Sequence, residues 1–151
     1  MAIARVLVDG YNLLHVWRQL ARGHPRHSEA AREALIRKLT HYGDAKGIPI
    51  TVIFDGYGRR SPSEDTAPAG IEVIYSTKGQ SADSLIERVA HLMRPHGEAL
   101  AVTDDHAQRD TVIAFGGFAQ GCEEFIAEVE GALGEFDQRL REHNRRERRG
   151  R

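Results

Sequence analysis

Three short apolar runs in this chain each end at an acidic residue. The runs are residues 5–8, 51–54 and 100–103, and the acids that follow them are Asp9, Asp55 and the pair Asp104 and Asp105. Short apolar runs between turn residues are typical of buried strands in a parallel sheet. Because parallel strands bring their carboxyl ends to one edge of the sheet, where open α/β folds bind ligands, we expect these acids to lie together.

Carboxylates gathered in this way repel one another, and burial makes the repulsion stronger. A hard divalent cation would offset it, since Mg²⁺ and Mn²⁺ prefer oxygen ligands. Asp83 adds a further acid at the start of a predicted helix, and Glu87 lies four residues later on the same helix face. Each acid taken singly has an ordinary explanation as a turn former, a helix cap or a first-turn acid. Their coincidence favours a metal site.

The alternation of strand-like and helix-like segments indicates the fold class. Strands are predicted at residues 3–8, 50–54, 71–75, 100–103 and 118–121, and helices at residues 11–20, 29–46, 82–94, 106–115 and from 123 onward. Ser28 is a plausible cap at the start of the second helix, and Gly47 ends it. This order predicts an α/β protein, folded as a three-layer α/β/α sandwich around a mostly parallel sheet.

Composition limits the class of protein. A chain of 151 residues with 40% hydrophobic and 28% charged residues is ordinary for one globular domain. The single cysteine, Cys122, excludes an internal disulfide and a cysteine-rich zinc site, and we interpret it as a small core residue. This cysteine usage fits a reducing cytoplasm. No segment has the pattern of a signal peptide or a membrane span, so we expect no membrane partner.

The net charge of −1 hides an uneven distribution. Residues 139–151 contain seven arginines and two glutamates, a net charge of +5, which leaves −6 for the rest of the chain. An acidic body with a basic tail is compatible with a carboxylate metal site and a phosphate-binding arm. A solvated helix end or a disordered terminus explains the tail equally well. We therefore divide the chain into a domain at residues 1–138 and a basic tail at 139–151 that continues the last helix.

Four segments resemble, in order, the motifs of the YacP-like NYN-domain nucleases, which are relatives of the PIN domain. The segments are Val8-Asp9-Gly10-Tyr11-Asn12-Leu13, Val52-Ile53-Phe54-Asp55, residues 81–87 and Val102-Thr103-Asp104-Asp105. The resemblance implies a PIN-like fold and metal-dependent cleavage of RNA with Mg²⁺ or Mn²⁺. It implies Asp9, Asp83 and Asp105 as the metal-binding acids, with Asn12 as a polar neighbour and Asp55 as an accessory acid. We assign Glu87 an accessory role as well.

One departure from the family pattern affects this assignment. The family usually has Thr-Ser-Asp where this chain has Thr103-Asp104-Asp105, so either aspartate is a candidate metal ligand. The resemblance also suggests mRNA as the substrate and the ribosome as a partner, although no residue of this chain shows either.

We expect RNA to be bound by residues outside the acidic site. The candidate phosphate contacts are Arg59, Arg60, Lys78, Arg145 and Arg146. Tyr11, Tyr57 and Trp17 are possible stacking platforms for bases, but Trp17 falls in a predicted helix and is more often a core residue. Cleavage by a metal-activated water needs no nucleophilic side chain.

Three other classes of protein compete with a nuclease. A nucleic-acid-binding module that has lost catalysis would have no use for clustered carboxylates. A receiver-type signalling domain also gathers acids around Mg²⁺, but it needs an acid pair after the first strand, where this chain has Asp9 followed by Gly10. A haloacid-dehalogenase-like phosphatase would need an acid where Tyr11 stands.

Overall fold

The computed structural model describes residues 3–25, 27–55, 71–76, 81, 84–86 and 98–150. Its elements are β1 (Ile3–Asp9), α1 (Gly10–Val16), α2 (Glu29–Lys46), β2 (Ile50–Phe54), β3 (Ile71–Tyr75), β4 (Glu98–Val102), α4 (His106–Ala114), β5 (Phe118–Gln120) and α5 (Cys122–Arg149). Several residues singled out from the sequence lie outside this description: Asp83, Glu87, Arg59, Arg60, Lys78 and Tyr57. Most of the helix predicted at 82–94 also lies outside it, and residues 84–86 are helical.

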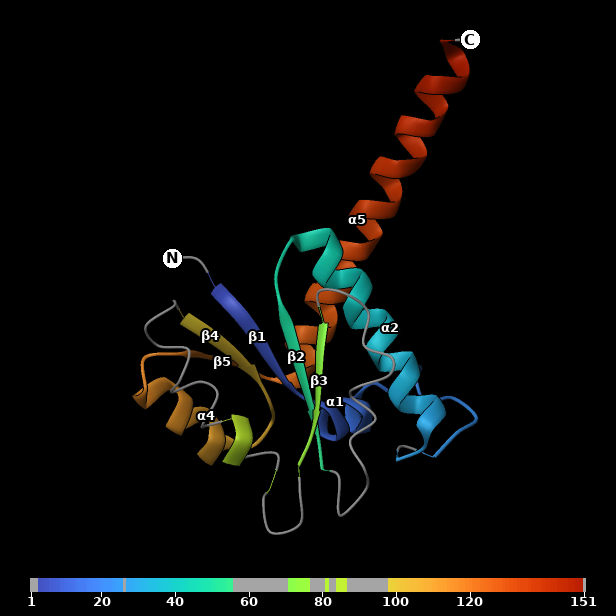
Figure 1. Ribbon diagram of the computed structural model, residues 1–151. Helices are drawn as coiled ribbons and strands as arrows, with labels where there is room; N and C mark the ends of the chain where they lie inside the picture. Colours follow the sequence, from blue (N-terminus) through green and yellow to red (C-terminus); the bar gives the residue numbers. More distant parts are fainter. Residues whose placement is uncertain are drawn as a thin grey trace.

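The five strands form one parallel sheet in the order β3-β2-β1-β4-β5 (Figure 1). Every described strand pair is parallel, which confirms the predicted mostly parallel sheet. β1 lies at the centre, between β2 and β4. The carboxyl ends of these three strands therefore emerge next to one another at one edge.

Alternation along β1 divides the core into two clusters. Val6 and Val8 contribute to a cluster that includes buried residues of α1, α2 and α5, whereas Leu7 belongs to a second cluster with Val112 of α4 and with Ile86. Successive side chains of a strand point to opposite faces, so the two clusters lie on opposite faces of the sheet. This arrangement gives the predicted three layers, with α2 and α5 apart from α4 (Figure 1).

Helix α2 begins and ends as its sequence predicts. The Ser28 hydroxyl accepts a hydrogen bond from the Ala31 N–H over 3.2 Å, and Gly47 ends the helix in the left-handed conformation, with φ of 65°. The apolar residues spaced along the helix are all buried: Ala31, Leu35, Leu39 and Tyr42. Both the cap and the core-facing stripe are therefore confirmed.

The helix predicted at residues 11–20 is shorter than expected, because α1 ends at Val16. Trp17 follows at once and is only 3% exposed, and its indole N–H donates to Glu130 Oε1 over 3.3 Å. Residues 18–23 form turns, which allows Trp17 to enter the core instead of continuing the helix. Trp17 is thus a core residue and no stacking platform.

The predicted start of β4 at residue 100 was also wrong, since the pairing of β4 with β1 begins at Glu98.

Helix α5 is buried in its first half only. Its buried residues are Cys122, Phe125, Val129 and Leu133, and the residues from Gly134 to Gly150 are exposed. The second half projects beyond the rest of the molecule (Figure 1). Phe136 and Leu140 continue the apolar stripe onto this projecting half, where they are 44% and 49% exposed. Among the described helices none is long and apolar enough to cross a membrane.

Candidate active site

The ends of β1 and β4 bring three acids to one edge of the sheet. Val8 of β1 is paired with Val102 of β4, so Asp9 and the residues after Val102 leave neighbouring strands at the same level. Asp104 and Asp105 follow there, and both are exposed. Asp55 follows β2 on the other side of β1. The structure therefore places the four described acids on the edge at which the sequence predicts them.

Asp9 also starts helix α1. Its Oδ1 accepts a hydrogen bond from the Asn12 N–H over 3.3 Å, which is the usual N-cap contact. A Cβ atom at Gly10 would overlap the ring of Phe54, so only glycine allows the first turn of α1 to lie this close to β2. The Asp-Gly pair thus fixes both the position of the carboxylate and the direction of the helix behind it.

Asn12 connects β1 to the segments after β4 and β5. Its Oδ1 accepts a hydrogen bond from the Asp104 backbone N–H over 3.0 Å and a second from the Cys122 thiol over 3.1 Å. A backbone N–H can only donate, so the side-chain atom facing it must be the oxygen. This identifies the orientation of the amide, and it leaves Nδ2 on the other side as a hydrogen-bond donor.

The two consecutive aspartates cap two different helices. Asp104 Oδ1 accepts from the Cys122 N–H over 2.9 Å at the start of α5, where the N-cap residue Gly121 has no side chain to do so. Asp105 Oδ1 accepts from the Gln108 N–H over 3.2 Å and caps α4. Asp104 therefore belongs to the network of Asn12 and Cys122, whereas Asp105 turns toward the helix on the opposite face of the sheet.

Cys122 is fully buried, as expected for a core residue. Burial raises the pKa of its thiol to about 12, with further contributions from the nearby carboxylates of Asp104 and Asp9. Both acids therefore lie within electrostatic range of one thiol. The sequence analysis missed the contact between Cys122 and Asn12, because these residues are 110 positions apart and neither belongs to a local motif with the other.

Asp55 occupies the β2 side of the edge. The Ser76 hydroxyl, just after β3, donates to Asp55 Oδ1 over 3.2 Å, and the Ser76 N–H donates to the Phe54 carbonyl over 2.9 Å. Ser76 was not recognised as a neighbour from the sequence. The strand register could have indicated it, since Phe54 is paired with Tyr75 and the residues that follow leave the sheet side by side.

The donor types suit a hard divalent cation, although the described part of the chain does not complete a metal centre. Asp9, Asp104 and Asp105 each use Oδ1 for a backbone N–H, and a carboxylate carries a second oxygen on which a cation can bind. Within the described ranges no three His, Cys, Asp or Glu side chains are gathered so that they could hold a metal ion. A centre of three acids thus needs a further carboxylate, and Asp83 lies outside these ranges.

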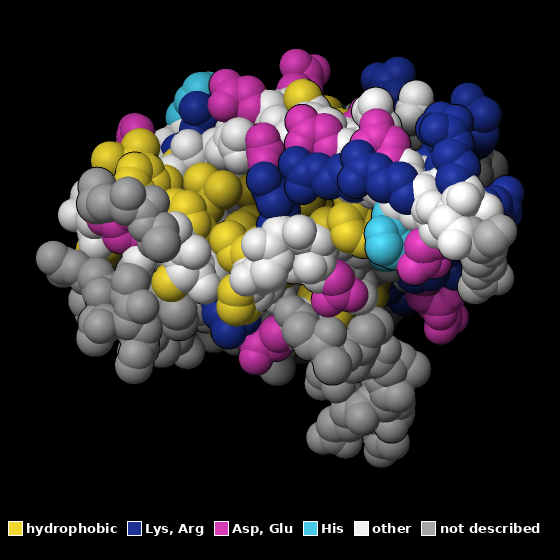
Figure 2. Space-filling model, turned by 90° about the horizontal axis from the view of Figure 1, so that it is seen from above, with side chains coloured by type: hydrophobic (Ala, Val, Ile, Leu, Met, Phe, Trp, Pro, Cys, Tyr) yellow, Lys and Arg dark blue, Asp and Glu magenta, His cyan; other side chains and the backbone are white. Residues whose placement is uncertain are grey.

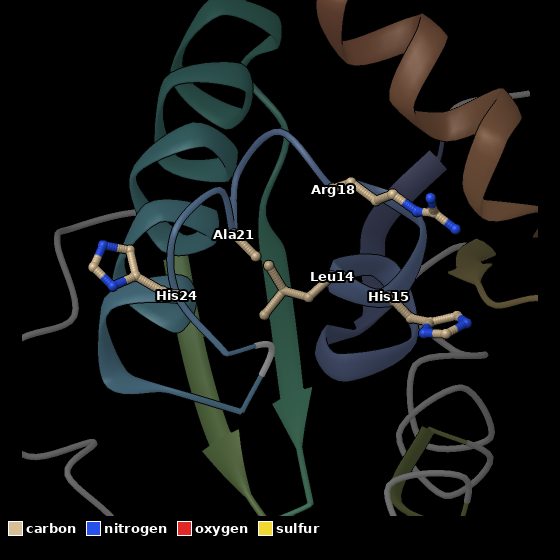
Figure 3. Close-up of a pocket in the computed structure, with 5 residues that line it drawn as sticks. All are labelled: Leu14, His15, Arg18, Ala21 and His24. Atoms are coloured by element: carbon tan, nitrogen blue, oxygen red, sulfur yellow. The ribbon is translucent and has the colours of Figure 1, made fainter.

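A pocket of about 300 Å³ opens beside α1 and the turns that follow it (Figure 3). It is lined by Leu14, His15, Arg18, Ala21 and His24. In Figure 3 the His24 side chain lies on the side opposite His15 and Arg18, so the two imidazoles do not converge on one point. None of the acids of the sheet edge lines this pocket, and we assign it no part in the candidate site.

Comparison with known proteins identifies the family. The model of a family described as the YacP-like NYN domain matches residues 6–151. The chain belongs to the YacP-like NYN domain family.

The relatives of this YacP-like NYN protein include the uncharacterized protein YacP of Bacillus subtilis (strain 168). The two are 28% identical over 137 residues, which cover 90% of this chain and 81% of the relative. A crystal structure of Rae1 (YacP) from Bacillus subtilis superposes with a TM-score of 0.80 at 26% identity, covering 99% of this chain and 86% of that one. The crystal structure of a tryptophan-to-leucine mutant of Rae1 (YacP) superposes with a TM-score of 0.77 at 27% identity, covering 91% of this chain and 81% of that one. The predicted PIN-like fold is confirmed.

Proposed function

We propose that this YacP-like NYN protein is a metal-dependent endoribonuclease that hydrolyses phosphodiester bonds in RNA. The observation that carries the proposal is the meeting of Asp9 and Asp104 around Asn12 at the carboxyl ends of neighbouring strands. The family supports it, because NYN domains are nuclease-like and PIN-like nucleases generally use divalent metal ions. Membership of the family supports a nuclease, and the acids at the carboxyl ends of β1 and β4 are our candidates for its site.

Mg²⁺ or Mn²⁺ would be held by Asp9, Asp83 and Asp105, with Asp104 as the alternative or additional ligand. These residues would hold a cation that, when bound, would supply an activated water and stabilise charge on the phosphoryl oxygens. Asp55 and Glu87 would act as accessory acids that hold ligands or water in place. Two of these residues, Asp83 and Glu87, lie outside the described part of the chain.

Asn12 would contact the substrate directly. Because its Oδ1 is held by Asp104 and Cys122, its Nδ2 can donate to a phosphoryl oxygen but its oxygen is poorly suited to bind the cation. Donors fixed before the reaction stabilise developing negative charge without any cost of reorganisation. We therefore assign Asn12 the role of a hydrogen-bond donor and not that of a metal ligand.

RNA would be bound by cationic side chains around this edge and on α5. Arg145 and Arg146 are exposed on the projecting half of the helix, and the other candidates, Arg59, Arg60 and Lys78, belong to segments outside the description. Figure 2 shows the side toward which α5 projects, at the end of the sheet opposite the acids, and there Lys and Arg side chains form a band with Asp and Glu beside it. Cytoplasmic mRNA, and the ribosome that carries it, are the substrate and partner that the family resemblance suggests.

The test is incubation of the purified protein with end-labelled RNA and single-stranded DNA of the same sequence. We expect cleavage of RNA with Mg²⁺ or Mn²⁺, none in EDTA, and products with a 5′-phosphate and a 3′-hydroxyl. The Asp9→Asn variant is the matched control. A 2′,3′-cyclic phosphate, or cleavage that persists in chelator, would contradict the mechanism. RNA binding with no turnover under any metal would instead indicate a module that has lost catalysis.

A further inference from the structure

Arg32 is a buried cation at the same end of the molecule as the acids. It lies in the first turns of α2 and is only 8% exposed. Within the described ranges no carboxylate forms an ion pair with it, and the ion pairs found there join Lys46 to Glu128 and His143 to Glu147. Arginine is almost never buried without a paired anion, because removing the charge from water is costly. A buried guanidinium for which the described ranges offer no carboxylate is a candidate anion-binding group.

The partners of Arg32 are neutral oxygens. Its Nη1 donates to the Tyr11 hydroxyl over 3.2 Å and to the His27 carbonyl over 2.6 Å. Burial pulls the pKa of Arg32 down, but the hydroxyls of Tyr11 and Tyr75 pull it up and leave it above its ordinary value, so the side chain stays charged. A guanidinium has five N–H donors in a planar fork, and both described hydrogen bonds use the same nitrogen. Donors therefore remain for a ligand.

Both tyrosines lie close in sequence to the edge of the sheet that carries the acids. Tyr11 comes two residues after Asp9, and Tyr75 comes one residue before Ser76, the hydrogen-bond partner of Asp55. Their rings are held by contacts with Phe54, at centroid distances of 5.0 Å from Tyr11 and 5.5 Å from Tyr75. The two tyrosine rings are thus held by packing on Phe54, and the guanidinium is held by its hydrogen bonds to Tyr11 and His27.

We propose that Arg32, Tyr11 and Tyr75 form a phosphate-binding subsite that holds a phosphate of the bound RNA strand next to the acidic site. A guanidinium fork flanked by hydroxyl donors matches the oxygens of a phosphate group. That the bound strand is RNA rests on the proposed function, whereas the binding of a phosphate by Arg32 does not. The phosphate is either an internal diester of the strand or its 5′-terminal monoester.

The test measures binding without catalysis. The melting temperature is recorded in EDTA with inorganic phosphate and with chloride at equal ionic strength, and the affinity for a short oligouridylate is measured in the same buffer. We expect phosphate to raise the melting temperature of the wild type and of Arg37→Gln, which removes an exposed arginine of the same helix. We expect no such rise in Arg32→Gln, and oligouridylate affinity lower by about tenfold.

Two further arms complete the design. Arg32→Lys keeps the positive charge and the aliphatic part of the side chain but loses the planar fork of donors. It replaces Arg32→Gln as the test variant if the glutamine variant does not fold. We expect its affinity for the oligouridylate to fall by about threefold or more. Oligouridylates with a 5′-phosphate and with a 5′-hydroxyl separate the two sources of phosphate. Binding of both at equal affinity assigns the subsite to an internal diester, and preference for the first assigns it to the terminal group.

The outcomes separate this proposal from the proposed function. An equal rise of the melting temperature in wild type and Arg32→Gln, or unchanged affinity in Arg32→Lys, would overturn the subsite whatever the nuclease assay shows. Loss of phosphate binding in the Arg32 variants would support it even if the wild type cleaved no RNA.

Discussion

The Cys122 thiol donates a hydrogen bond to Asn12 Oδ1 over 3.1 Å, and this contact holds the first turn of α1 against the first turn of α5. The backbone of Cys122 simultaneously donates to Asp104. One buried residue therefore positions both an amide and a carboxylate of the candidate site. Its small size suits the position, because it lies in the core directly beneath the edge.

We expect Cys122→Ala to lower RNA cleavage and stability, whereas Cys122→Ser should retain most of both. Alanine removes one of the two donors to Asn12 and allows the amide to rotate, at a cost of about 1 kcal/mol. Serine keeps a donor in the same place. The measurements are the cleavage rate at saturating RNA and the melting temperature. Equal rates in the alanine and serine variants would show that the thiol does not orient Asn12.

Native Cys122 should react slowly with alkylating reagents. Its pKa is raised from an ordinary value of 9.0 to about 12, so at pH 8 in EDTA its thiolate should be roughly a thousandfold rarer than in the unfolded chain. Alkylation by iodoacetamide, followed by mass spectrometry with and without denaturant, checks this. Because the pKa is raised in the folded state, the protonated thiol contributes fully to the free energy of unfolding below pH 9, and this contribution is lost as the pH rises toward 12. Fast alkylation of the native protein would contradict this burial.

Asp9→Asn and Asp9→Ala should separate the charge of the carboxylate from its role as a helix cap. Asparagine still accepts the N–H of Asn12, and it removes one negative charge from the acidic edge, so the metal-free melting temperature should rise or stay the same. Alanine loses the cap as well, which should cost about 1 kcal/mol and lower the melting temperature by about 2–4 °C. Both variants should lose cleavage. Equal destabilisation by both would show that this charge is not repelled by its neighbours.

The sequence predicted β1, β2 and the positions of the acids that follow them, because both depend on local pattern. The apolar runs that became β1 and β2, and the acids at their ends, are contiguous in the chain, and parallel pairing then determines which edge they share. The caps of α2 were predictable for the same reason, since Ser28 and Gly47 act within one turn of the helix.

The parts that were missed depend on contacts between distant segments. The early end of α1 follows from burial of Trp17 against α5, and nothing near Trp17 in the sequence encodes Glu130 as its partner. The cap that Asp104 provides for α5, and the burial of Arg32, likewise arise only when separate elements pack together. Tertiary packing overrides local preference at each of these positions.

Replacing Gln108 by methionine should stabilise the folded protein. Its side chain is 2% exposed, and neither its amide nitrogen nor its amide oxygen has a hydrogen-bond partner in the described part of the molecule. A buried polar group without partners costs about 1–3 kcal/mol, so Gln108→Met, which keeps the shape of the side chain, should raise the melting temperature by a few degrees. Its backbone N–H still reaches Asp105. A lower melting temperature would show that the amide is satisfied by water or by a residue outside the described ranges.

The projecting half of α5 should bind RNA through its charge. Residues 138–149 hold six arginines and two glutamates, whereas residues 122–137 hold six acids and no Lys or Arg. This segregation also suits the helix dipole, which favours acids at the start and cations at the end. The dipole effect fades within the last turn, however, so it does not account for the arginines at positions 139 and 141.

A chain that ends at Asn144 tests this role. It lacks five arginines, Arg145, Arg146, Arg148, Arg149 and Arg151, and it retains every residue of the sheet and of the core. RNA affinity should fall, and the slope of log affinity against log salt should flatten by about 0.7 for each phosphate of a single strand that the arginines no longer neutralise. Cleavage at saturating RNA should change little, because the acids at the strand ends are intact. Replacing Glu142 and Glu147 together by glutamine is the matched control, since it makes the same helix more basic and should tighten binding. Unchanged affinity and salt slope in both variants would remove this half of α5 from the RNA-binding surface and leave it as a solvated helix end or a docking element for another protein.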